Sequence, residues 1–177
     1  MGDRWDVSPL GILGYAAEKE GNIEQARSYY MEALTRAREA EDKGSIATQL
    51  NLIAELERRS GNYWEAISWY LQAIQAWSEL GNRGGIARCL EILAFMEYEQ
   101  DQPEQAARLL GAAEAVRQKS GSKMLPAEKS EYDAAVNCLQ EKLGVEALQA
   151  ALADGHGMTV EQALRQLSSR RLKAPTP

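Results

Sequence analysis

The stretch GNIEQA at residues 21–26 returns as GNYWEA at residues 61–66 and, altered, as DQPEQA at residues 101–106. The two intervals between successive copies are equal, and large, small and apolar side chains elsewhere in the chain recur at the same interval. The interval is about 40 residues, and a fixed period in the range of about 20 to 50 is typical of proteins that stack one structural unit. The sequence therefore predicts three copies of such a unit.

Each copy reads as two helices joined by a tight turn. Ile46, Leu50 and Ile53 are spaced by four and three residues, which places them on one helix face. Gly61 and Asn62 follow, and both tolerate the left-handed backbone that ends a helix. We expect the small residues Ala26, Ala66 and Ala106 where paired helices cross. We expect Tyr30 and Tyr70 to fill the gap to the next hairpin, and Trp77 to pack there too.

These positions resemble the tetratricopeptide repeat, whose signature is W-x2-L-G-x2-Y, then A-x3-F, then P. The first copy offers Leu13 and Gly14, and then Ala26 followed by Tyr30. The resemblance implies an all-α, right-handed solenoid of three helical hairpins that binds a protein or peptide. The closing proline is absent, and the period is 40 rather than 34. We expect either longer helices or extended loops, such as GNRGG at residues 81–85.

The repeat phase is lost after residue 122, and new helix signals follow. Pro126 can open a helix that Gly144 ends, with an apolar set of Tyr132, Ala135, Val136, Leu139 and Leu143. A short helix from Val145 to about Ala153, a loop at 154–157, and a helix to about residue 171 complete the prediction. Thr159 and Gln162 fit a capping box before the last helix.

The predicted organisation has four parts. They are an inter-repeat-like segment at 1–9, three repeats within 10–121 (about 10–43, 44–83 and 84–121), capping helices at 122–171 and a flexible tail at 172–177. A cap fits a solenoid because an open end exposes an apolar face.

Three blocks, at residues 106–117, 126–132 and 158–164, are similar to the C-terminal end of bacterial signal-transduction ATPases of the STAND class, which include LuxR-type transcriptional regulators. This resemblance implies the sensor or partner-binding arm of such a regulator. GDRWDV at residues 2–7 is similar to the stretch at 81–86, so we expect a fragment that begins at a repeat boundary. The alternative is a stand-alone scaffold or adaptor that assembles a complex.

Composition excludes several classes of function. The net charge of −6 and pI near 5.0 argue against nucleic-acid and anionic-membrane partners. No apolar run reaches the roughly 18 residues of a membrane span, and the polar N-terminus is no signal peptide. Cys89 and Cys138 lie in apolar helical patterns, so we expect two core residues in a reducing cytoplasm.

Motifs for catalysis, metals or cofactors are missing. The chain has neither G-x4-G-K-[ST] nor G-x-G-x-x-G. The single histidine, His156, rules out most histidine-based metal sites, and we expect it to be solvated in a loop. The prediction is a protein that is not an enzyme and carries no cofactor.

In tetratricopeptide proteins the first helix of each repeat lines the binding face. The outward residues then include Tyr15, Asn51, Glu55, Arg58, Arg88, Glu91, Phe95 and Tyr98. Aromatic, charged and amide groups suit a peptide or a small effector, and a merely solvated groove is a nearly equal alternative. A carboxylate clamp of the chaperone-binding type would use positions 11, 15, 52, 88 and 92, of which only Arg88 fits. Trp64 is a candidate exposed contact residue, and Trp5, Leu10 and Leu13 could mediate self-association through the N-terminal solenoid end.

Overall fold

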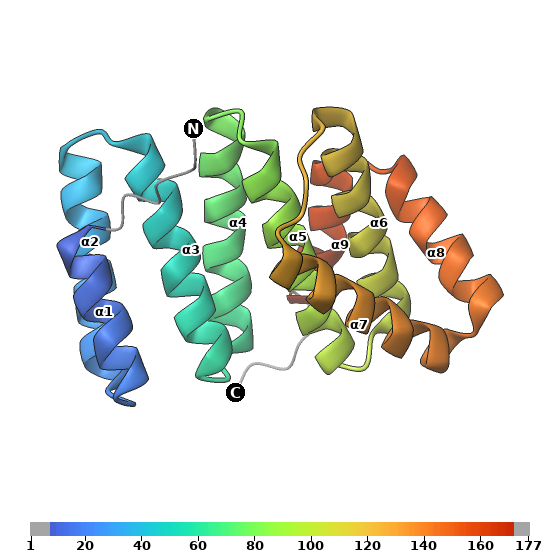
Figure 1. Cartoon of the computed structure of the whole chain (residues 1–177), viewed down its shortest axis with the longest axis horizontal. Helices are drawn as coiled ribbons and strands as arrows, with labels where there is room; N and C mark the ends of the chain where they lie inside the picture. Colours follow the sequence, from blue (N-terminus) through green and yellow to red (C-terminus); the bar gives the residue numbers. More distant parts are fainter. Residues whose placement is uncertain (1–7, 172–177) are drawn as a thin grey trace. The chain divides into compact units, whose positions relative to one another are not determined.

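The computed structural model describes residues 8–171, with side chains to residue 167, and this part of the chain contains nine helices and no strand (Figure 1). The helices are α1 (Pro9–Lys19), α2 (Ile23–Glu39), α3 (Lys43–Arg59), α4 (Tyr63–Glu79), α5 (Arg83–Glu99), α6 (Pro103–Ser120), α7 (Pro126–Leu143), α8 (Val145–Gly157) and α9 (Val160–Arg171). The predicted all-α fold of helical hairpins is confirmed. The expectations for the segment at 2–7, for Trp5 and for the tail at 172–177 lie outside the described residues.

The turns explain the long period of the repeat. Helices α2 to α5 each have 17 residues, and three residues separate each from the next. A left-handed residue recurs at the same place in successive turns, at Gly21, Glu41, Gly61, Gly81, Asp101 and Gly121. One period is therefore two equal helix-and-turn units, and long helices account for the difference from the usual period of this repeat.

The extended loop expected at residues 81–85 is wrong. Helix α5 begins at Arg83, and the Asn82 side chain accepts a hydrogen bond of 2.9 Å from the backbone N–H of Gly85. This N-cap satisfies one of the free N–H groups of the first turn. Gly84 and Gly85 therefore belong to the helix rather than to a loop.

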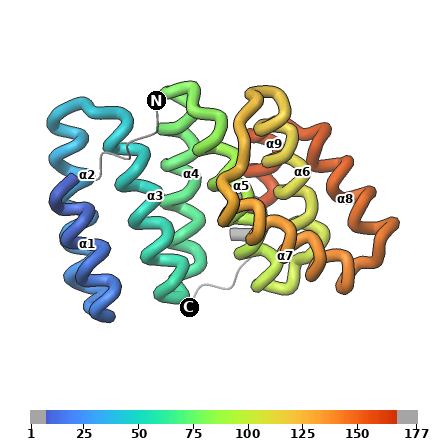
Figure 2. Tube along the Cα trace, viewed as in Figure 1, coloured from blue at the N-terminus to red at the C-terminus, as the bar shows by residue number. Residues whose placement is uncertain are grey.

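The chain divides into two compact units, residues 1–81 and 82–177. In the first unit α1 packs on α2, α2 on α3, and α3 on α4, as the trace in Figure 2 shows. Ala26 and Ala66 are fully buried, and so are Tyr30 and Tyr70; Trp77 is only 7% exposed. Packing was the expected role of these aromatic side chains.

Tyr30, however, lies against its own hairpin rather than reaching only toward the next one. A Cβ atom added to Gly14 would lie 2.4 Å from a carbon of the Tyr30 ring. Position 14 therefore has to be small because the ring occupies the space that a side chain would need. The hydroxyl of Tyr30 donates to Glu18 on the same α1 helix.

In the second unit α5 and α6 form a hairpin, α8 packs along α6, and α7 touches α5, α6 and α8 less extensively. The predicted start at Pro126 and stop at Gly144 are confirmed for α7. The capping box is confirmed as well. The Thr159 N–H donates to the Gln162 side chain at 2.8 Å, and the Gln162 N–H donates to Thr159 Oγ1 at 3.2 Å.

Three expectations for this unit are wrong. Residues 154–157 form the last turn of α8 and not a loop, so His156 is a half-buried helical residue. Gly155 fits there because α8 crosses α6 closely at that point. Cys138 is exposed and not in the core, since α7 buries only Leu139 fully.

Candidate functional site

The first-helix face of the first unit carries Tyr15 on α1 and Asn51, Glu55 and Arg58 on α3. The spacing of three and four residues along α3 aligns the last three on one side of that helix. All three are half-buried, whereas the Tyr15 side chain is 53% exposed. The Lys19 ammonium lies 5.1 Å from the centre of the Tyr15 ring, one turn further along α1.

Glu18 joins α1 to its neighbours on this side of the unit. It accepts a hydrogen bond of 3.1 Å from the Tyr30 hydroxyl, and its other oxygen lies 2.5 Å from the Arg59 guanidinium. Burial raises the pKa of Tyr30, and the negative charge of Glu18 raises it further. Tyr30 therefore remains a neutral donor at physiological pH, which holds Glu18 in place.

Glu55 is the centre of a second group. Arg58 donates to both of its carboxylate oxygens, at 3.0 and 2.7 Å, and the Tyr70 hydroxyl donates at 2.8 Å. Burial acts to raise the pKa of Glu55, but the hydrogen bond and charge of Arg58 outweigh burial and lower it. Glu55 is therefore a fixed anion and not a proton carrier near neutral pH. This arrangement is suited to binding rather than to acid–base catalysis.

On the second unit the predicted residues Arg88, Glu91, Phe95 and Tyr98 share one side of α5, and Phe95 and Tyr98 are half-buried. Glu91, which we expected to face outward, is fully buried. The reason is Arg117 of α6, whose guanidinium donates to both Glu91 oxygens at 2.6 and 3.1 Å. The pair is shielded from solvent, with side-chain exposures of 8% for Arg117 and 0% for Glu91.

Helix α7 covers part of this side of α5. Arg88 lies 2.6 Å from Glu131 of α7, and Arg117 lies 3.3 Å from Glu128. At the other end of α7, Lys142 pairs with Asp101, and its ammonium lies 5.4 Å from the centre of the Tyr98 ring. Arg88 is therefore engaged within the chain and is not presented to a carboxylate ligand.

Sequence reasoning missed the α7 residues Glu128, Glu131 and Lys142, and it missed Arg117. One signal was available for Arg117, because it occupies the position of the buried Trp77 in the preceding repeat. A charge at a buried repeat position requires an opposite charge nearby. No periodic signal marks the α7 residues, since α7 lies outside the repeat phase.

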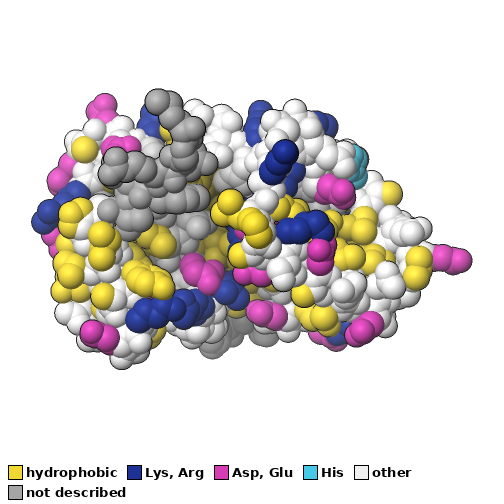
Figure 3. Space-filling model, in the orientation of Figure 1, with side chains coloured by type: hydrophobic (Ala, Val, Ile, Leu, Met, Phe, Trp, Pro, Cys, Tyr) yellow, Lys and Arg dark blue, Asp and Glu magenta, His cyan; other side chains and the backbone are white. Residues whose placement is uncertain are grey.

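Trp64, expected as an exposed contact, is half-buried, because its ring packs edge-on against Tyr63 with the centres 4.9 Å apart. A clearer exposed apolar surface lies on α1, where Ile12 is 58% and Leu13 is 47% exposed. Hydrophobic side chains gather over α1 at the left of Figure 3.

Among residues 8–167, no group of three or more His, Cys, Asp or Glu side chains is placed to hold a metal ion. None of the described helices is both long enough and apolar enough to span a bilayer.

Comparison with known proteins defines the class. The tetratricopeptide repeat family matches residues 7–74 and 44–119, which together exceed half of the chain. The chain belongs to the tetratricopeptide repeat family, whose members in general are non-catalytic scaffolds that bind protein partners.

The fold is also similar to that in the crystal structure of BtubC (BKLC) from P. vanneervenii, with a TM-score of 0.65 and 19% identity. The alignment covers 95% of this chain and 65% of that chain, so this chain spans about two thirds of its length. A search of curated proteins gave no significant match.

Proposed function

We propose that the chain is a non-catalytic module that binds a protein or peptide segment on the first-helix faces of its repeats. The exposed Tyr15 ring carries this proposal. It stands beside Lys19 of the same helix. An exposed aromatic side chain surrounded by polar groups held in place is typical of protein contact surfaces.

The polar groups on the first helices α1 and α3 favour a ligand that adds contacts rather than one that replaces them. Glu18 and Glu55 already bind Arg59 and Arg58, and the side chains of these arginines are 44% and 28% exposed. A partner can therefore reach the guanidinium edges while the carboxylates keep them oriented. A small effector with a carboxylate or phosphate could use the same edges.

Site-specific cross-linking tests this proposal. Tyr15 is replaced by p-benzoylphenylalanine, and the labelled chain is irradiated in extract of the source cells. We expect one dominant adduct. The matched control places the same group at Tyr29, a half-buried tyrosine of the second helix α2. Equal adducts at both positions, or adducts at position 29 alone, would contradict a binding site on α1.

We further propose that the module is the sensor or partner-binding arm of a bacterial cytoplasmic STAND-type ATPase or transcriptional regulator. The similarity of residues 106–117, 126–132 and 158–164 to such proteins supports this. These blocks lie on α6, α7 and the segment that leads into α9. An antibody against the chain should detect a native polypeptide several times heavier than 19.6 kDa. A band at 19.6 kDa would favour the alternative, a stand-alone scaffold or adaptor.

Self-association through α1 is a separate proposal, and the repeat register supports it. Leu13 is 47% exposed, whereas its equivalent Ile53 on α3 is 1% exposed in a helix that packs on α2. A helix therefore covers the face of α3 that carries Ile53. Among the described residues, no helix covers the equivalent apolar face of α1. Concentration-dependent sedimentation should disappear in Leu13→Gln and persist in Val145→Gln, which alters a similarly exposed apolar residue on α8.

A further inference from the structure

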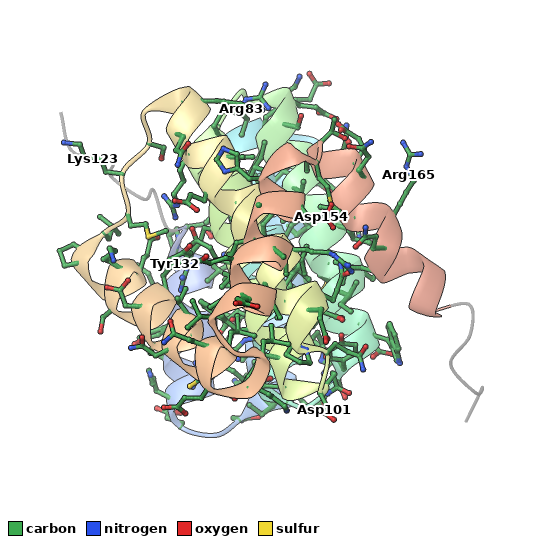
Figure 4. All side chains as sticks on the ribbon, turned by 90° about the vertical axis from the view of Figure 1, so that its right-hand side faces the viewer. Arg83, Asp101, Lys123, Tyr132, Asp154 and Arg165 are labelled. Atoms are coloured by element: carbon green, nitrogen blue, oxygen red, sulfur yellow. The ribbon has the colours of Figure 1, made fainter. Side chains whose placement is uncertain are left out.

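Helix α7 lies on the side of α5 where the proposed function places a partner. Its first turns carry Glu128 and Glu131, which face Arg88 of α5 and Arg117 of α6. Its last turn carries Lys142, which reaches Tyr98 and Asp101. In Figure 4, Asp101 lies at the lower end of the unit and Lys123, which precedes α7, at the upper end.

The contacts of the two helices are in register. Arg88 of α5 contacts Glu131 of α7, and Tyr98 of α5 contacts Lys142 of α7. The number of positions between Arg88 and Tyr98 is nearly the same as the number between Glu131 and Lys142. Each separation corresponds to about 15 Å of helix. Between these two contacts, helices α5 and α7 therefore run in the same general direction.

Apolar packing holds α7 only weakly. Leu139 is the single fully buried side chain among its 18 residues, and Leu125 at its N-cap is 59% exposed. Helix α8 differs, because its backbone meets that of α6 at Gly155. A helix with so few buried contacts is drawn from the low-stability end of a structure.

Ion pairs add charge complementarity to this limited apolar packing. The Arg88 guanidinium lies 2.6 Å from Glu131, 3.7 Å from Glu91 and 3.9 Å from Glu128. Glu128 and Glu131 share a helix face because they are three residues apart. Any helix with two carboxylates at this spacing and a cation about three turns later could make the same contacts.

We propose that α7 is an intramolecular occupant of a partner-binding face, and that this face accepts an acidic amphipathic helix of a partner protein in its place. The proposal rests on the proposed function, that the first-helix faces bind protein segments. The partner helix places carboxylates on Arg88 and on the edge of Arg117 that Glu128 of α7 contacts, and a lysine or arginine on Tyr98 and Asp101. Binding and the release of α7 are then one coupled step.

The test uses the whole chain and a fluorescent peptide of residues 124–144 as a surrogate partner. In the wild type α7 competes with the peptide, so binding should be weak. Glu131→Arg places two positive charges together and should release α7, and peptide affinity should rise at least tenfold. Glu131 is 54% exposed, so the substitution should not unfold the chain.

Two controls are matched to this variant. Glu141→Arg makes the same charge change at an exposed residue of α7 that forms no ion pair with α5 or α6 in the described part of the chain, and it should leave affinity at the wild-type value. A peptide in which Glu128 and Glu131 are both lysine should fail to bind the Glu131→Arg chain. Hydrogen exchange of the wild type should show α7 amides exchanging at least tenfold faster than those of α6 and α8.

Other results would overturn the proposal. They are α7 amides as protected as those of α8, equal peptide affinity in the wild type and in Glu131→Arg, or equal binding of the acidic and lysine peptides. These outcomes are separate from the fate of the proposed function, because cross-linking at Tyr15 reports on the first unit. A partner cross-linked at Tyr15, together with equal peptide affinity in the wild type and in Glu131→Arg, would leave that function intact and end this inference.

Discussion

Gly111 of α6 and Gly155 of α8 lie where the backbones of the two helices touch. A Cβ atom on Gly111 would lie 2.1 Å from the carbonyl oxygen of Leu152, and one on Gly155 would lie 1.9 Å from that of Arg108. Neither neighbour is a side chain that could rotate away. The Arg108–Asp154 ion pair, at 2.8 Å, spans the same two helices.

We predict that Gly111→Ala and Gly155→Ala each lower the free energy of unfolding of the second unit by about 3 kcal/mol or more, because a methyl group would force the helices apart. Urea denaturation followed by far-ultraviolet circular dichroism measures the change. Gly157→Ala is the control on the same helix, since no atom lies within 4 Å of its added Cβ. It should change stability by about 1 kcal/mol or less, in the stabilising direction. Equal losses in all three variants would refute the close crossing.

Glu41 occupies a turn position that glycine fills in most of the other turns. Its φ of 53° is in the left-handed region, and its side chain is exposed. We predict that Glu41→Gly raises the free energy of unfolding by about 0.5–1 kcal/mol, because the strain of a side chain in this conformation is removed. The urea midpoint should rise at constant slope.

The reverse change provides the comparison for that turn. Gly61→Ala places a side chain at an equivalent position with a φ of 79°, and it should lower stability by about 1 kcal/mol. If both variants shift the midpoint in the same direction, backbone strain is not what distinguishes these turns.

The ion pair of Glu55 and Arg58 should make stability depend on pH in the acid range. The folded-state pKa of Glu55 is lowered, so its contribution is present above the unfolded pKa and is lost as pH falls through the folded pKa. A partly exposed pair contributes about 0.2–1 kcal/mol. In Glu55→Gln the difference in stability between pH 6 and pH 3 should shrink by that amount. An unchanged difference would mean that Glu55 does not titrate with folding.

The two thiols should differ sharply in reactivity. Burial raises the pKa of Cys89 to about 12, whereas Cys138 is exposed on α7. A disulfide reagent such as Ellman's reagent should label one thiol per folded chain quickly, since thiolate fraction and access both govern the reaction. Cys138→Ser should abolish this fast phase, and Cys89→Ser should leave it unchanged. Fast labelling of two thiols would place Cys89 outside the core.

Sequence pattern predicted the helical hairpins because repetition reports on local conformation. Apolar spacing, Asn or Asp at helix starts and glycine in turns are properties of short segments. The capping box of Thr159 and Gln162 was predictable for the same reason. Where the signal was ambiguous, as for the glycines at 84 and 85 or at 155, an N-cap or a helix crossing determined the conformation instead.

The candidate binding residues were predictable only in part. Tyr15, Glu55 and Arg58 were recognisable as first-helix residues, yet the hydrogen bond from Tyr70 to Glu55 depends on how α3 and α4 pack. The burial of Glu91 could not be deduced, because it depends on Arg117, 26 residues further along the chain.

By itself the sequence determined the all-helical repeat, its period and the family, since these follow from local periodicity repeated three times. Only the tertiary structure decided that α7 lies along α5 and that Gly111 meets α8. Both depend on contacts between segments that share no period, where backbone shape and charge pairing select one arrangement among many with the same local preferences.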